Sequence, residues 1–103
     1  MAGFTWKISI YKSGGGYMYD PADLKQVRVG DQIIWSNKDD RPHWPGRVIQ
    51  TADGETTIDN TYFMAHQIAP HSPSDPFVPT AGNLTYVDSL DPNGPTGTIE
   101  VSK

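Results

Sequence analysis

The fold class is decided by residues 27–39, which read Val-Arg-Val-Gly-Asp-Gln-Ile-Ile-Trp-Ser-Asn-Lys-Asp. Val27 and Val29 alternate with polar neighbours, as expected of a strand with one buried face. Gly30 and Asp31 are typical of a tight turn, and apolar residues resume directly after it, up to Trp35. The segment therefore predicts two short β-strands joined by a turn.

The same alternation recurs along the chain, whereas helical periodicity is hard to find. The expected strand segments are 4–10, 17–19, 26–29, 32–35, 48–49, 84–87 and 98–101. About seven short strands at spacings near ten residues are typical of an antiparallel sandwich. We therefore expect an all-β, antiparallel β-sandwich of about seven to eight strands, with at most one short helix.

One long irregular insert, roughly residues 60–82, interrupts this pattern. Within it Pro70, Pro73, Pro76 and Pro79 recur at every third position, which is the period of polyproline II. Proline has no backbone N–H, so an extended segment of this kind protects a strand edge from further pairing. We expect the insert to lie over an edge of the sandwich. In an alternative interpretation it forms a stiff rim that shapes a site or binds a partner.

Length and composition limit the possible functions. The 103 residues are sufficient for a single domain, 1–103. The absence of cysteine excludes disulfides, thiolate catalysis and thiolate-bound metals. A net charge of −4 with no basic block argues against nucleic-acid binding. The longest apolar run is too short for a membrane span, and we expect no signal peptide at the start of this chain.

Two stretches resemble the cupredoxin family, the blue-copper β-sandwiches of which plastocyanin and pseudoazurin are examples. Residues 27–39, followed by His43, are similar to the family pattern of Val-x-x-Gly-Asp, an apolar pair, Trp, Asn, Asp and the first copper-binding histidine. Residues 81–92 and 96–101 resemble the Gly-x-x-x-Tyr strand, the ligand loop and the closing Gly-x-x-x-Val strand. The resemblance implies a Greek-key sandwich and an exported or periplasmic location, and it implies that Asn37 links neighbouring loops by hydrogen bonds.

The copper ligands of that family do not carry over. His43 falls on the first histidine, but Asp88 stands where the family has its cysteine and Asp91 where it has the second histidine. The position of the axial methionine is taken by Gly94 or Pro95. A blue-copper site needs two imidazoles and a thiolate, so this chain cannot form one.

One hypothesis is that a different metal site remains. His43, Asp88 and Asp91 offer one nitrogen and two carboxylates, a donor set suited to a divalent ion such as Zn, Cu(II), Mn or Fe. His66 or His71 from the insert could supply a further ligand. In this alternative the chain is a non-blue metal-binding protein.

The leading hypothesis is a non-redox binding or assembly module without a cofactor. No Ser–His–Asp set, phosphate-binding loop or zinc-protease motif is present, so we expect no enzymatic activity. The expected recognition surface comprises the loops around His43, Trp44, Asp88 and Asp91. Trp44 and Pro45, with nearby Tyr62 and Phe63, would form an apolar patch for a protein partner.

Overall fold

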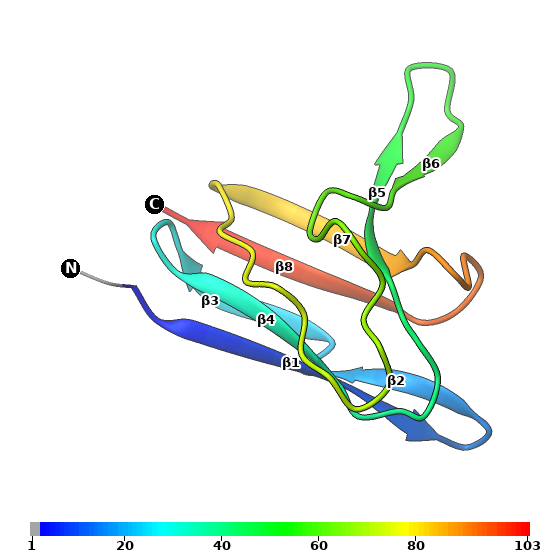
Figure 1. Ribbon diagram of the computed structural model, residues 1–103. Helices are drawn as coiled ribbons and strands as arrows, with labels where there is room; N and C mark the ends of the chain where they lie inside the picture. The colour runs from blue at the N-terminus through cyan, green and yellow to red at the C-terminus, as the bar shows by residue number, and fades with distance from the viewer. Residues whose placement is uncertain (1–2) are drawn as a thin grey trace.

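A computed structural model describes residues 3–103, which form eight strands in two sheets (Figure 1). The strands are β1 (Thr5–Ser13), β2 (Gly16–Asp20), β3 (Asp23–Arg28), β4 (Gln32–Asn37), β5 (Pro45–Gln50), β6 (Thr56–Asp59), β7 (Gly82–Asp88) and β8 (Thr96–Ser102). A three-stranded sheet has the order β2-β1-β4, and a five-stranded sheet has the order β3-β8-β7-β5-β6. The expected all-β sandwich is confirmed. No helix within residues 3–103 is long and apolar enough to cross a membrane.

The turn at Gly30 transfers the chain from one sheet to the other. Gly30 has a φ of 102°, a left-handed conformation that glycine adopts without steric cost. The two strands predicted from residues 27–39 therefore do not pair with each other. β3 instead runs parallel to β8, and β4 runs parallel to β1, while the remaining strand pairs are antiparallel.

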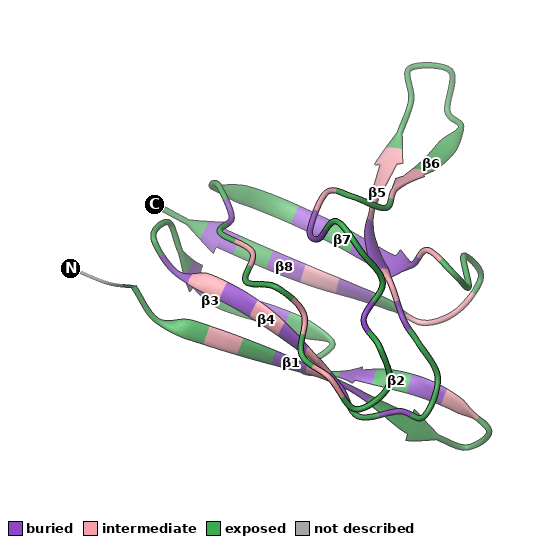
Figure 2. Cartoon of the chain, in the orientation of Figure 1, coloured by how far each residue is buried: buried purple, intermediate pink, exposed green. Residues whose placement is uncertain are grey.

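Aromatic and aliphatic side chains fill the space between the sheets. Figure 2 shows buried residues alternating with exposed ones along several strands, as the period of two requires. Trp35 and Tyr86 are fully buried, with ring centroids 5.5 Å apart. A Cβ at Gly97 would lie 2.2 Å from the Tyr86 ring, so only glycine leaves room for this side chain. The buried cluster comprises Ile8, Ile10, Tyr17, Tyr19, Leu24, Val27, Ile33, Trp35, Phe63, Met64, Ile68, Leu84, Tyr86, Ile99 and Val101.

The proline-rich insert covers the outer edge of β4, as its sequence predicts. Ile33 and Phe77 exchange two backbone hydrogen bonds, each 2.8 Å long. Ser74 N–H donates to the carbonyl of Trp35, and Asn37 N–H donates to that of Ser72. The insert also contributes apolar side chains to the core. It is therefore part of the packed structure and fixes the edge of the sheet that leads to His43.

Candidate functional site

Two loops meet at one end of the sandwich, one joining β4 to β5 and the other joining β7 to β8. His43 is anchored by a bridge in which it exchanges backbone hydrogen bonds with Ile68 of the insert. The buried Asn37 side chain donates from Nδ2 to the carbonyls of Arg41 (2.8 Å), Ile68 and Ala69 (both 3.2 Å). As the resemblance implies, this asparagine links neighbouring segments and so fixes the loop that carries His43.

The imidazole of His43 lies between two carboxylates. Its Nδ1 is 2.6 Å from Oδ2 of Asp88, and its Nε2 is 2.8 Å from Oδ2 of Asp39. All three residues are at most 2% exposed. With both carboxylates ionised, both ring nitrogens must donate, so the ring is an imidazolium cation. We refer to Asp39, His43 and Asp88 as the buried triad.

The remaining oxygens of the buried triad also have partners. Oδ1 of Asp88 accepts the backbone N–H groups of Trp44 and Leu90, each at 2.9 Å. Oδ1 of Asp39 accepts the N–H of Asp40 at 2.7 Å, and the Asp39 N–H donates to Oδ1 of Asn37. This complete pairing is what a buried charged group requires.

These contacts determine the charge state of the three side chains. Burial alone would lower the pKa of His43, but the hydrogen bonds to Asp88 and Asp39 outweigh it and raise this pKa above the ordinary 6.5. Burial would raise the pKa of Asp39, yet the hydrogen bond from His43 and those from Asp40 lower it to about 2. The pKa of Asp88 is lowered too, because His43, Trp44 and Leu90 donate to its carboxylate against the effect of burial.

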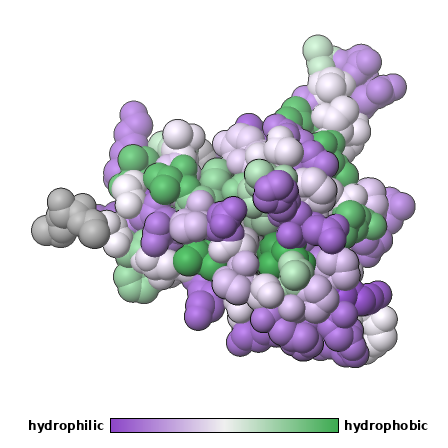
Figure 3. Space-filling view, viewed as in Figure 1, coloured by the Kyte–Doolittle hydropathy of each residue, from purple (hydrophilic) through white to green (hydrophobic). Residues whose placement is uncertain are grey.

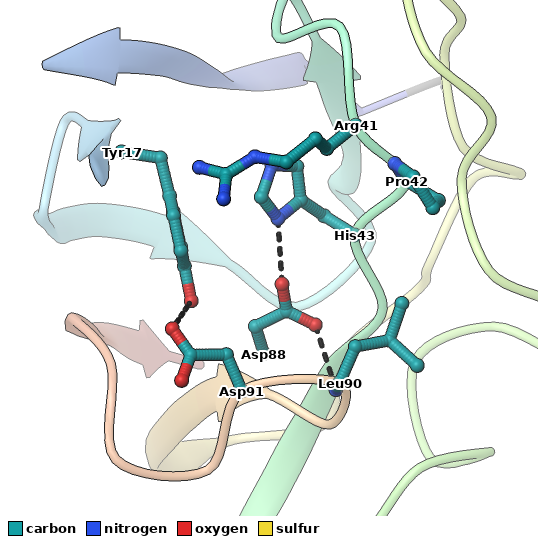
Figure 4. A pocket seen from close by; sticks show the side chains of 7 residues that line it. All are labelled: Tyr17, Arg41, Pro42, His43, Asp88, Leu90 and Asp91. Atoms are coloured by element: carbon teal, nitrogen blue, oxygen red, sulfur yellow. Dashed lines mark hydrogen bonds and ion pairs between the residues drawn. The ribbon is translucent and has the colours of Figure 1, made fainter. Parts of the chain in front are cut away.

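A pocket of about 450 Å³ opens beside the buried triad (Figure 4). Its lining residues are Tyr17, Arg41, Pro42, His43, Asp88, Leu90 and Asp91. The Tyr17 ring packs on the imidazole at a centroid distance of 4.4 Å, and its hydroxyl donates to Oδ2 of Asp91 at 3.0 Å. Leu90 is 48% exposed at the rim, and the exposed Arg41 lies over Tyr17. The pocket therefore combines a tyrosine ring, an apolar rim and groups of both charges.

The structure brings together some of the residues predicted from sequence and separates others. His43, Asp88 and Asp91 line one pocket, but Asp91 bonds Tyr17 instead of His43. His66 and His71 lie exposed in the insert. Within residues 3–103 no group of three or more His, Asp or Glu side chains is placed to hold a metal ion.

The expected apolar patch is smaller than its sequence suggests. Trp44 is half-buried, and its indole N–H donates to the carbonyl of Met64 at 3.4 Å. Pro45 is less than 2% exposed and Phe63 is 4% exposed, so neither has much surface to offer a partner. Both side chains are buried because β5 and the insert pack directly on the core.

Sequence reasoning missed Asp39 and Tyr17 as members of the site. The available signals for Asp39 were its place at the end of the motif of residues 27–39, where the family pattern also has Asp, and its position four residues before His43 in the same loop. Tyr17 comes from β2 and is 74 positions away from its partner Asp91, so no local pattern connects them.

Comparison with known proteins identifies the fold. No family model matches the sequence, and no curated protein matches it. Among solved structures, an oxidised single-site mutant of amicyanin matches with a TM-score of 0.64 and 20% identity, over 94% of this chain and 81% of that one. A Cu(I) form of another amicyanin mutant matches with a TM-score of 0.65 and 20% identity, over 98% and 85% of the two chains. The fold is cupredoxin-like.

The side chains present do not fit the copper centre of a blue cupredoxin. The chain contains no cysteine, so no thiolate can reach the pocket. The one histidine of the buried triad has both nitrogens within hydrogen-bond distance of carboxylates, which leaves it no free lone pair while it is protonated. This cupredoxin-like chain therefore has an imidazolium between two carboxylates where the resemblance would place copper ligands.

Proposed function

We propose that this domain is a non-redox binding module whose recognition surface is the end of the sandwich that carries the pocket beside the buried triad. The observation that supports this function is the pairing of His43 with Asp39 and Asp88 at 2.8 and 2.6 Å. A positively charged ring between two carboxylates links the same loops that a metal would link, and it does so without an electron-transfer centre.

The pocket rim has the chemistry of a protein-binding surface. Leu90 is 48% exposed, and the exposed Pro42 extends the apolar area, while the buried Tyr17 ring forms part of the pocket wall. Arg41 has a side chain that is 54% exposed, and Asp91 adds a carboxylate on the other side of the pocket. Apolar groups beside charges of both signs are typical of the boundary between interface core and rim, and the fixed loops pre-organise this surface for binding.

A pair of matched variants tests the proposal. Leu90→Arg places a charge on the pocket rim, whereas Val78→Arg does the same at a residue that is 63% exposed in the insert. We expect a partner captured from the source cell, and then purified, to bind the wild type and Val78→Arg equally. We expect the partner to bind Leu90→Arg at least about tenfold more weakly than the wild type, because the substitution removes an apolar anchor of the interface. Equal binding to all three proteins would contradict the proposed surface.

The alternative function is divalent-metal binding by His43, Asp88 and Asp91. One observation favours it, since all three residues line the same pocket, but Asp91 would have to leave Tyr17 and join His43 and Asp88 before the three could hold one ion. A divalent ion there would have to replace the protons of the His43 imidazolium, so its binding would release protons and strengthen as pH rises. Native mass spectrometry with Cu²⁺, Zn²⁺, Mn²⁺ and anaerobic Fe²⁺ tests this function. One bound ion in the wild type and none in His43→Ala would establish metal binding and contradict the metal-free module.

A further inference from the structure

Away from the pocket, the hairpin formed by β5 and β6 extends beyond the body of the sandwich (Figure 1). We refer to its outer part, residues 48–59, as the arm. Its strands pair antiparallel, with Val48 opposite Ile58 and Gln50 opposite Thr56. β6 pairs with β5 alone and ends the sheet order, so its outer backbone edge is unpaired within the described chain.

The tip of the arm is acidic and has a defined shape. Thr51 N–H donates to the carbonyl of Glu55 at 2.8 Å, and Gly54 N–H donates to that of Thr51 at 3.0 Å. Asp53 and Glu55 are exposed, and the pKa of Asp53 is lowered by hydrogen bonds from Thr51 and from the Glu55 N–H. Figure 3 shows hydrophilic atoms at the tip of the arm, beside a few weakly hydrophobic ones, and more strongly hydrophobic atoms nearer its base. The arm therefore presents a negatively charged end on a partly apolar ribbon.

A groove of about 510 Å³ lies along the side of the sandwich between β1 and β3. We call it the lateral groove, and its lining residues are Trp6, Lys25, Gln26, Arg28 and Ser102. The Trp6 indole is held in place because its Nε1 donates to Oδ2 of Asp31 at 2.9 Å. The ring of Phe4, which is 61% exposed, packs edge-on against it at 4.7 Å. The groove thus has a rigid aromatic wall.

The lateral groove also carries cations in a chain whose net charge is −4. Lys25 and Arg28 are exposed, and neither forms a salt bridge with any carboxylate of residues 3–103. Asp31, the carboxylate nearest in sequence to Arg28, already accepts hydrogen bonds from Phe4 N–H, the Trp6 indole and Arg28 N–H. Within residues 3–103 neither cation is held in a direct ion pair, and the charge of Asp31 acts on Arg28 only at longer range, so both can still meet an acidic partner.

The strand edges beside the groove are open as well. Within residues 3–103, β2 pairs with β1 only from Ser9 onward, so residues 5–8 of β1 have a strand partner, β4, on one side only. In the described part of the chain, β3 pairs with β8 alone and ends the five-stranded sheet. Open edges of this kind accept a further strand from another chain.

We propose that the acidic arm of one copy of this chain binds in the lateral groove of a second copy. Asp53 and Glu55 would pair with Lys25 and Arg28, and the open edge of β6 would lie along an open strand edge beside the groove. The arm and the first half of β1 lie far apart on the molecule (Figure 1), so one chain cannot make this contact with itself. The contact is head-to-tail and generates rings or open chains of copies. This inference is independent of the proposed function, because it uses neither the pocket nor the buried triad.

Sedimentation velocity across a wide concentration range tests the inference. We expect the average mass of the wild type to rise with concentration, and to rise less at high salt. Arg28→Glu and Glu55→Lys should each weaken association by about tenfold or more, because each sets like charges against each other. The matched controls Lys38→Glu and Asp75→Lys change exposed charges elsewhere and should associate like the wild type.

Mixing the two interface variants gives the decisive result. Every contact between Arg28→Glu and Glu55→Lys molecules again sets a cation against an anion, so the mixture should associate more strongly than either variant does alone. Circular dichroism of each variant shows that its fold is intact. The proposal is wrong if the wild type stays monomeric at every concentration, if the controls weaken association as much as the interface variants do, or if the mixture stays monomeric.

Discussion

The aromatic core and the buried triad are equally inaccessible to water, yet they are stabilised by opposite means. Trp35 and Tyr86 are fully buried and gain stability from apolar area and ring packing. Asp39, His43 and Asp88 are at most 2% exposed and gain theirs from charge-assisted hydrogen bonds, against a desolvation cost. The comparison teaches that burial alone does not predict how a region responds to substitution or to pH.

The two regions should fail in different ways. An aromatic side chain in the core contributes to the free energy of unfolding in proportion to the volume it fills. This contribution does not depend on protonation. A member of the buried triad contributes little net energy while its partners are present, but its removal leaves a buried charged group unpaired. Substitutions in both regions, made at several pH values, can separate these two forms of stabilisation.

The largest effect should come from the core. Trp35→Ala removes the ring that packs against Phe63, Phe77 and Tyr86, with centroids 5.0, 6.5 and 5.5 Å away. We expect a loss of about 4 kcal/mol in the free energy of unfolding, as for other buried tryptophans. Urea unfolding at pH 5 and pH 8 measures it, and the loss should be equal at the two pH values. A loss that differs strongly with pH would remove the distinction between the regions.

The next largest effect should come from Asp88. Asp88→Ala leaves the imidazolium without one partner and the N–H groups of Trp44 and Leu90 without an acceptor. We expect a loss of about 3 kcal/mol in the free energy of unfolding. Asp88→Asn is the matched control, because its amide oxygen can still accept the two backbone N–H groups. It should lose clearly less stability than Asp88→Ala, and equal losses would show that the backbone contacts are unimportant.

Much of the sandwich could be predicted because its signals are local. The alternation in residues 4–10, the turn at Gly30 and the proline spacing of the insert each act over a few positions. The meeting of His43 with Asp88 could also be anticipated, since the resemblance placed both at ligand positions. These features depend on strand periodicity and on the turn residues that the fold needs.

The rest of the site depends on long-range packing. The contact of Tyr17 with His43 requires β2 to lie against the loop after β4, and neither segment carries a pattern that names the other. The sequence predicts Pro45, with Trp44, in an apolar patch for a partner, but Pro45 is the first residue of β5 and is buried against the core. Which side chains of a loop turn inward is decided by the tertiary structure, so the sequence alone could not distinguish them.

A pH profile sharpens the comparison further. The pKa of His43 is raised in the folded chain, so its stabilising effect is fully present below about pH 6.5 and is lost as pH rises through the folded-state pKa. The pKa of Asp39 is lowered from 3.8 to about 2, so its effect is present above pH 3.8 and is lost as pH falls toward 2. The contribution of the buried triad should therefore be largest between about pH 4 and pH 6.5.

Urea midpoints measured from pH 3 to pH 9 check this profile. The decline on the alkaline side should disappear in His43→Leu and remain in His66→Asn, whose histidine is exposed in the insert. If the urea midpoint of His43→Leu still fell on the alkaline side, the fall would come from a group other than His43. The buried triad would then be as insensitive to alkaline pH as the aromatic core.

The smallest effect is expected where the two regions meet. Tyr17 is 5% exposed, packs on His43 and belongs to the core cluster, while its hydroxyl donates to Asp91 at 3.0 Å. Tyr17→Phe keeps the ring and removes only this hydrogen bond, so we expect a loss of about 1 kcal/mol in the free energy of unfolding. The pH profile should keep its shape, because the contacts of His43 with both carboxylates persist. A Tyr17→Phe variant with an altered alkaline decline would show that Asp91 and Tyr17 act as one unit with the buried triad, and the boundary between the two regions would then lie beyond Tyr17.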